Sequence, residues 1–301
     1  MSLNSRQLAP LVLAVCLLLS GRVAFAGSAT DLNGLYYTGL NSSGGLAAGG
    51  ATDSHWTVTY ARVNGTNYSG TSTYTGTAYV LSSSYIDAAY VANTSSSQWI
   101  TAPGASTAST GGTANVGGDY LPGNGTTGTN SAYYVYRLAF NITGTGSGTV
   151  SNDIQISMTI AADDAYTVYV NPSSSPTVNS SGVINAGGTA ASASGTSAWN
   201  NTTSFALGNS TAHSGDVNDA AFVIGTNYIY IVVANTNSQT GTNGSTALNP
   251  SGLLVYQVGS GITIDGHVIP ETGTWLPVVA ALGLFGWRRL RRRPAAGRSI
   301  G

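Results

Sequence analysis

Asp153-Ile154-Gln155-Ile156-Ser157-Met158-Thr159-Ile160 alternates polar and apolar side chains without interruption. Successive side chains of a β-strand point to opposite faces, so the apolar residues of this stretch share one side of a sheet. The next run, residues 165–170, shows the same period of two. These two runs predict neighbouring β-strands with one buried face, and they set the expected fold class of the domain.

The rest of the central region is consistent with this reading. Between Ala29 and Thr263, runs of β-branched and aromatic residues alternate with clusters of Gly, Ser, Thr and Asn, and no helical period occurs. This pattern predicts one all-β sandwich. The other predicted strands are 56–63, 77–81, 133–140, 204–207, 227–234 and 253–258. Residues 227–234 are apolar on both faces, which is typical of a central strand between two layers. The connectors 101–131 and 172–198 offer little to bury, so we expect mobile surface loops there.

Residues 1–26 have the features of a secretory signal peptide. Arg6 supplies the positive charge, Leu8–Leu19 form the apolar region, and Ala24-Phe25-Ala26 is an A-x-A cleavage site. The only cysteine, Cys16, lies inside this peptide. The exported chain is therefore expected to lack disulfides and thiolate metal sites.

The charge is divided unevenly along the chain. All ten basic residues are arginine, and between residues 27 and 287 only Arg62 and Arg137 face ten aspartates and Glu271, a formal charge of −9. An acidic domain repels phosphate groups, which argues against nucleic acid and anionic lipid as partners.

The C-terminus combines three features of a sorting signal. A short motif at residues 268–275 precedes an apolar segment at residues 275–287, and residues 288–301 form an arginine-rich tail. The arginines of this tail stay charged and are expected to stop transfer across a membrane: Arg288, Arg289, Arg291, Arg292 and Arg293. We therefore divide the chain into a signal peptide (1–26), an ectodomain (27–263), and a linker with sorting helix (264–301).

The motif resembles the PEP-CTERM signal of Gram-negative bacteria, whose usual form is V-P-E-P-S-T-W. Ile269, Pro270, Glu271, Thr274 and Trp275 match it in order and spacing, while Thr272 departs from it. The resemblance implies processing by an exosortase, an integral-membrane protease, and then release or transfer to the cell surface. The thirteen residues from Trp275 to Trp287 fall short of the roughly 20 that span a bilayer, which favours a transient inner-membrane anchor.

A second interpretation of the same motif remains open. Ile269-Pro270-Glu271-Thr272-Gly273 is similar to the L-P-x-T-G signal of Gram-positive sortases, where cleavage would fall between Thr272 and Gly273. We favour the exosortase because Trp275 follows Thr274 directly and the chain contains no lysine.

The ectodomain resembles galactose-binding-like jelly rolls found in PEP-CTERM proteins. The matching pieces follow in order: Tyr136–Phe140, Ala161–Asn171, Gly225–Ile229, Val233–Asn235 and Asn249–Leu253. The departure is Pro172, which stands where that group has a glycine. The resemblance implies a jelly-roll β-sandwich, a common carbohydrate-binding scaffold.

Catalysis is not expected. His55, His213 and His267 lie in separate polar segments, and the only glutamate, Glu271, belongs to the sorting motif. The chain also lacks the usual hydrolase, zinc and phosphate-binding motifs.

Asp163 and Asp164 form the one adjacent acidic pair before a predicted strand. Their oxygens suit Ca²⁺, with Asn171 or the Asp216/Asn218/Asp219 cluster completing a shell. Alternatively, one aspartate caps the turn and the other is solvated, which is the interpretation that we favour; no other cofactor is expected.

Trp56, Trp99 and Trp199, with Tyr166 and Tyr169, are candidates for a stacking platform that contacts sugar rings. The alternative is that the tryptophans fill the core of a domain poor in Phe and Leu, and we favour this for each of them. Together, these features predict a non-catalytic exported protein of the cell surface or extracellular matrix, with exopolysaccharide as a potential contact. The alternatives are a dedicated carbohydrate-binding module and a sortase-anchored adhesin.

Overall fold

The computed structural model describes the β-rich part of the chain: residues 28–64, 76–81, 86, 90–102, 131–150, 154–179, 183–187, 199–208, 222–235, 252–256, 262–265 and 267–268. Every regular element in these ranges is a β-strand, which confirms the all-β class. None of the described residues belongs to a helix that could span a membrane.

The described strands number fourteen in chain order. They are β1 (Ser28–Asn33), β2 (Thr52–Asn64), β3 (Gly76–Val80), β4 (Ile100–Thr101), β5 (Ser131–Thr145), β6 (Ile154–Ala162), β7 (Ala165–Val170), β8 (Thr177–Val178), β9 (Ile184–Asn185), β10 (Thr203–Gly208), β11 (Gly225–Asn235), β12 (Leu253–Tyr256), β13 (Ile262–Ile264) and β14 (His267–Val268).

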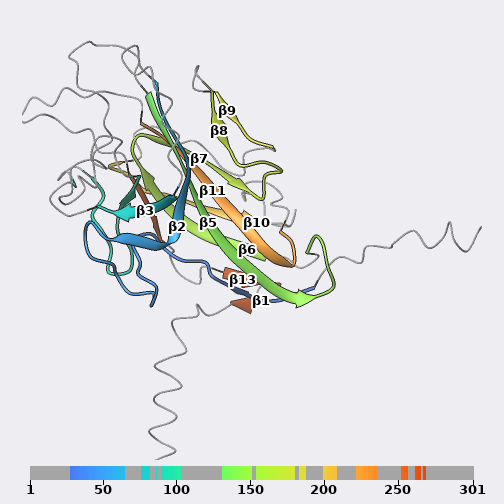
Figure 1. Cartoon of the computed structure of the whole chain (residues 1–301). Helices are drawn as coiled ribbons and strands as arrows, with labels where there is room; N and C mark the ends of the chain where they lie inside the picture. Colours follow the sequence, from blue (N-terminus) through green and yellow to red (C-terminus); the bar gives the residue numbers. More distant parts are fainter. Residues whose placement is uncertain are drawn as a thin grey trace, which may run out of the picture.

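Two long strands organise the sheet, and all pairings are antiparallel. β5 pairs with β1 and β2 along one edge and with β11 along the other, and β7 lies beyond β11. β6 pairs with β12 and β13 along one edge and with β10 along the other. β3 and β4 join the two groups by linking β2 to β12. The predicted pair of sheets is therefore one curled sheet whose two halves face each other (Figure 1).

The curl encloses a main core that alternate residues supply from both halves. Ile154, Ile156, Met158 and Ile160 of β6 are all buried in it, as the alternation of the sequence predicts. Facing them are alternate residues of β5 and β11: Tyr134, Tyr136, Leu138, Phe140, Ile142, Ile229, Ile231 and Val233. Since these strands are apolar at every second position, the sheet must turn that face inward to remove it from water.

The opposite face of β5, β11 and β7 forms a second apolar cluster, which we call the tyrosine face. Its buried members are Tyr133, Val135, Tyr169, Tyr230 and Val232, with Val178 of the β8–β9 hairpin packed onto them. Tyr60 donates a hydrogen bond to the Val178 carbonyl at 2.7 Å. Part of the segment 172–198, expected as a surface loop, instead forms the β8–β9 hairpin (Figure 1). This hairpin buries Val178 against the sheet, so the expectation is wrong there.

A third cluster covers the outer side of β6 and β12. Trp99, Leu81, Ala161 and Leu254 are its buried members, and Tyr90 and Val91 pack against them. Gly252 lies under the Trp99 ring so closely that a Cβ there would stand 2.8 Å from Trp99 Cε3. The absence of a side chain at residue 252 therefore lets the indole ring lie flat on the sheet.

Two asparagines from the jelly-roll-like motifs fasten the end of β7 to the start of β11. Asn227 is fully buried, and its side chain bonds to the amide and carbonyl of Val223, to the Gly225 carbonyl and to Asn171. Asn171 has φ of 42° and accepts the Tyr228 N–H at 2.7 Å. Because every donor and acceptor of Asn227 is used, this buried amide carries little desolvation penalty.

The domain has two distinguishable ends. β1 contacts β13, so the first and last parts of the described chain lie together at one end (Figure 1). The β6–β7 turn at Asp163 and Asp164 lies at the other end of β6, about 26 Å away at 3.3 Å per residue. The β13–β14 pair extends the sheet to Val268, beyond the predicted ectodomain boundary at residue 263.

Candidate functional site

An aromatic and acidic cluster lies at the end of the domain farthest from β1 and β13. Tyr90 is its centre: its hydroxyl donates a hydrogen bond of 2.6 Å to the Asp163 carboxylate. Its ring lies 5.4 Å from the Trp99 ring and 5.6 Å from the Trp199 ring, both in tilted arrangements. Such offset aromatic contacts are favourable beyond the area they bury.

Backbone hydrogen bonds hold this cluster in place. Asp163 N–H donates to the Gly252 carbonyl at 3.1 Å, and Asp164 N–H to the Ala234 carbonyl at 2.8 Å. Val91 N–H donates to the Trp199 carbonyl at 2.9 Å, while the Trp99 indole N–H donates to the Val91 carbonyl at 2.8 Å. The 90–99 segment and Trp199, which lies four residues before β10, are therefore fixed to each other and to the β6–β7 turn.

The three predicted tryptophans do not form one platform. Trp56 lies in the main core and Trp99 in the cluster over β6 and β12, and neither has any exposed area. A sugar ring has no access to them, and core packing accounts for both. Tyr166 and Tyr169 are also buried. Trp199 is half-buried, so it alone of the three has area exposed to solvent.

The predicted acidic pair is split between two environments. Asp163 is 2% exposed and bonded to Tyr90, whereas Asp164 is half-buried. Asn171 cannot complete a calcium shell with them, because the six residues of β7 separate it from Asp164 by about 20 Å. Within the described ranges, no three His, Cys, Asp or Glu side chains gather as a metal site would require. Asp216, Asn218 and Asp219 lie outside those ranges.

The predicted sorting residues also lie outside the described ranges. Val268, the first residue of the motif, pairs with Thr263 in the β13–β14 ladder. Ile269 through Trp275 and the five arginines of the tail follow it and are not described.

A buried carboxylate that the sequence did not single out fastens the loop before β2. Asp53 has no exposed area and accepts three backbone N–H groups, from Gly39, His55 and Trp56, at 2.6 to 2.8 Å. The neighbouring His55 ring stacks on Tyr36 at 3.5 Å, and its Nε2 lies 3.0 Å from the Asn41 carbonyl oxygen. Only its position before an alternating run marks Asp53 in the sequence, and many aspartates share that feature.

Burial raises the pKa of the Asp53 carboxyl above its ordinary value of 3.8. The hydrogen bonds from Trp56, His55 and Gly39 and the charge of His55 act in the opposite direction without cancelling it. The folded protein therefore holds this proton more tightly than the unfolded chain does.

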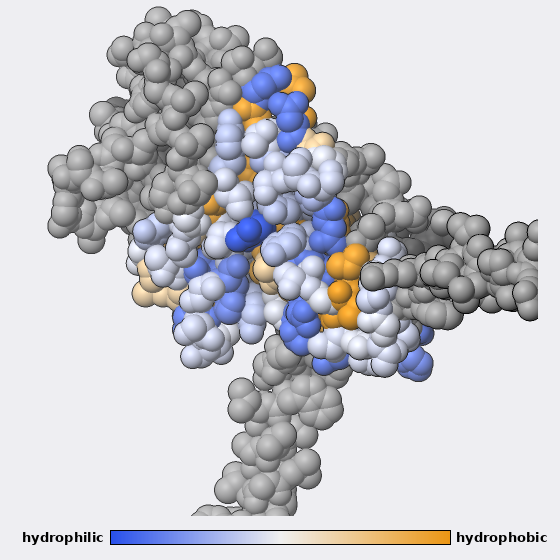
Figure 2. Space-filling view, turned by 45° about the vertical axis from the view of Figure 1, so that its right-hand side comes forward, coloured by the Kyte–Doolittle hydropathy of each residue, from blue (hydrophilic) through white to orange (hydrophobic). Residues whose placement is uncertain are grey.

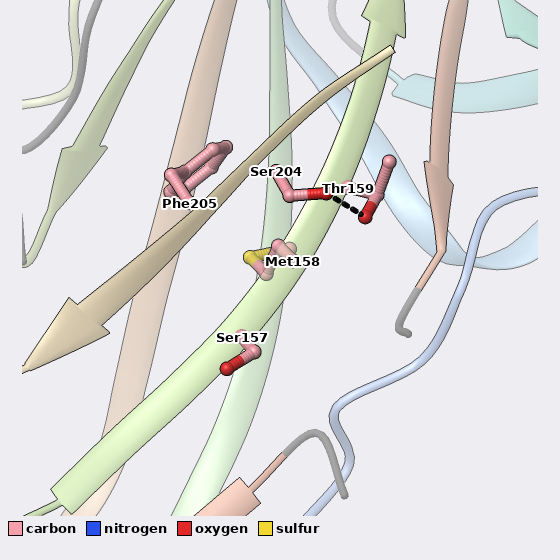
Figure 3. A pocket seen from close by; sticks show the side chains of 5 residues that line it. All are labelled: Ser157, Met158, Thr159, Ser204 and Phe205. Atoms are coloured by element: carbon pink, nitrogen blue, oxygen red, sulfur yellow. Dashed lines mark hydrogen bonds between the residues drawn. The ribbon is translucent and has the colours of Figure 1, made fainter. Parts of the chain in front are cut away.

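A small hollow lies where β10 pairs with β6 (Figure 3). Ser157, Met158, Thr159, Ser204 and Phe205 line it. The Thr159 and Ser204 hydroxyls satisfy each other at 2.8 Å, and Met158 is a buried part of the main core. The hollow has no charged group, and two of its three hydroxyls are bonded to each other. It is therefore a weaker candidate than the Trp199 cluster.

The face shown in Figure 2 is mostly polar or neutral, with small apolar patches that remain separate from one another. Val183 and Leu46 are the large apolar side chains with the most exposure among the described residues, at 54% and 45%. They lie in the β8–β9 turn region and in the loop before β2, far apart in the sequence.

Comparisons with known proteins add no identification. No protein-family description, curated protein or solved structure matches the chain.

The raised pKa of Asp53 predicts a particular dependence of stability on pH. Between 3.8 and the higher folded pKa, the folded state binds more protons than the unfolded state, so the stability contributed by this group falls as pH rises through that window. Asp53→Asn removes the titration while keeping the side-chain shape. Urea unfolding from pH 3 to 7 should show that the free energy of unfolding of wild type, relative to Asp53→Asn, declines with rising pH and then levels off. A difference that instead grows with pH would mean that the three N–H donors outweigh burial.

Proposed function

We propose that this chain is a non-catalytic protein of the bacterial cell surface or extracellular matrix, exported through its signal peptide and sorted through its C-terminal tail. The observation that carries the proposal is the order of motif, apolar segment and arginine cluster in residues 268–301. Guanidinium groups remain charged in a bilayer, so such a tail halts in the inner membrane while the preceding domain lies outside. An exosortase-like protease then removes the tail at the motif.

The positions of the domain ends support this proposal. β1 begins at Ser28, two residues after the predicted cleavage site at Ala26, and β14 ends at Val268, where the predicted motif starts. Both signals can therefore be removed without taking a strand from the main sheet. Since β1 and β13 meet at one end, a tail-anchored domain presents its other end, with Trp199, away from the membrane.

We further propose that the curled sheet is a jelly roll of the galactose-binding-like kind. Asn171 and Asn227, which belong to the two strand motifs of that resemblance, bond to each other across β7 and β11. A non-catalytic role agrees with the use of the buried carboxylates: Asp53 binds three backbone amides and Asp163 binds Tyr90. Both side chains are committed to holding loops in place.

The sorting proposal predicts the C-terminus of the mature protein. Mass spectrometry of the protein from fractionated cells should find the residues beyond Trp287 missing in the surface or extracellular fraction. Deleting the processing protease should leave the uncut chain in the inner membrane. Cleavage between Thr272 and Gly273 by a sortase would support the Gram-positive alternative, and an intact tail on surface-exposed protein would contradict both.

A second candidate function is carbohydrate binding, which the partial exposure of Trp199 favours. The ring rests on Tyr90 and its backbone is fastened to Val91, so the ring is held rigidly. Aromatic faces bind the C–H patches of sugar rings, and a rigid ring loses little entropy on binding. Asp164, half-buried at the same turn, adds a carboxylate that can accept hydroxyl hydrogen bonds.

Binding to polysaccharide from the producing cell tests this second candidate. Trp199→Ala should weaken binding about tenfold or more, whereas Trp199→Tyr should retain most of it, because the variant keeps an aromatic face. Val183→Ala, at an exposed position on the hairpin, is the matched control and should bind as wild type does. Retention of full affinity in a folded Trp199→Ala variant would exclude this site.

A further inference from the structure

Arg137, in the middle of β5, is a basic residue that lies at the tyrosine face. In the sheet, Arg137 lies directly opposite Tyr230 of β11 on one side and Thr57 of β2 on the other. Its guanidinium carbon lies 5.4 Å from the centre of the Tyr228 ring, a cation–π distance. Tyr228 and Tyr230 contact each other at 6.2 Å between ring centres. Arg137 is thus held by aromatic stacking on the surface of the sheet.

The guanidinium group has no polar partner within the described part of the chain. Its Nε atom is buried and makes no hydrogen bond. The terminal nitrogens make none either, and since they are not among the buried unpartnered atoms, solvent reaches them. A guanidinium carries five donors in a planar fork that matches a carboxylate, and here the four donors of the two terminal nitrogens are available.

Arg137 lies at the border of the hairpin that covers the rest of the tyrosine face. Ser175, just before β8, makes a 3.1 Å hydrogen bond with the Tyr230 hydroxyl, and Tyr60 reaches the Val178 carbonyl. These contacts hold the hairpin over Tyr133, Val135 and Tyr230, which are buried. Arg137 and Tyr228 remain half-buried, while the next outward residue of β5, Ala139, is exposed. The uncovered part of the face is therefore a cation and an aromatic ring side by side.

Asp31 and Asp164, two described aspartates that are at least partly exposed, lie too far from Arg137 to cancel its charge. Asp31 pairs with Thr143, which lies six residues along β5 from Arg137. At 3.3 Å per residue, this separates Asp31 from Arg137 by about 20 Å. Asp164 adjoins Ala165, which pairs with Ala234, four residues or about 13 Å along β11 from Tyr230. Both distances exceed the screening length of about 8 Å at physiological ionic strength. An anion at Arg137 is attracted locally, although the domain as a whole repels polyanions.

We propose that Arg137 and Tyr228 bind the carboxylate-bearing sugar units of an acidic polysaccharide. The guanidinium fork takes the carboxylate, and the exposed part of the Tyr228 ring packs on the C–H face of the same or the neighbouring sugar. This inference rests on the proposed extracellular role and names the class of polysaccharide. The site is separate from Trp199, which lacks a cation and suits neutral sugars.

Affinity electrophoresis of the full chain in gels that contain alginate, a polyuronate, tests the site. Wild type should be retarded by alginate and not by neutral dextran. Arg137→Gln should weaken alginate binding about tenfold, and Arg137→Lys should recover only part of it, because a lysine keeps the charge but loses the planar fork. Leu46→Ala, at an exposed position in the loop before β2, serves as the control, with affinity equal to wild type. Thermal unfolding of each variant verifies that it is folded.

Three outcomes would overturn the inference. Wild type is not retarded by alginate, or Arg137→Gln binds alginate as tightly as wild type does. In the third, polyglutamate retards wild type as much as alginate does, which would indicate an acidic protein partner. The proposed function fails separately. Loss of alginate binding with correct surface sorting removes only this site, whereas alginate binding by a protein that stays in the cytosol removes the sorting proposal.

Discussion

The fold depends on the two-sidedness of its long strands. β5, β6 and β11 turn alternate apolar residues into the main core, and the sheet curls because those rows from both halves must meet out of water. The remaining rows face outward and are also rich in apolar residues. A curled sheet alone would leave these outer rows exposed to solvent. The β8–β9 hairpin covers part of the tyrosine face, and the 90–99 segment covers β6 and β12.

Both proposed contact sites occur where these two covering segments end. Trp199 and Tyr90 mark the border of the cover over β6 and β12, and Arg137 and Tyr228 mark the border of the hairpin. At each border a half-buried ring, Trp199 or Tyr228, packs against a neighbouring tyrosine ring, which gives an aromatic surface that is held in place and partly accessible. The two borders differ in charge, because Asp163 and Asp164 adjoin the first and Arg137 belongs to the second. The proposed surface for neutral sugars and the proposed surface for acidic sugars can thus occur on the same domain.

The sequence predicted those features that depend on local alternation. All eight predicted strands are strands, and residues 165–170 have the predicted bounds of β7. It could not predict β4, β8, β9 or β14, because each is two residues long and too short for an alternating pattern to show. It missed Tyr90 because this residue lies in a Ser- and Ala-rich stretch and gains its role from contacts with the distant residues Asp163 and Trp199. Composition offered no means of separating Trp199 from the fully buried Trp56 and Trp99.

The most direct test of this account compares two neighbouring residues of β6. Ile156 is fully buried in the main core, whereas Ser157 points to the opposite face and is partly exposed. If the curled sheet shares one core, Ile156→Ala should lower the free energy of unfolding by about 2–5 kcal/mol, and Ser157→Ala should change it by no more than about 0.5 kcal/mol. Equal effects of the two substitutions in chemical denaturation would contradict the alternation on which the sheet, its covers and both contact sites depend.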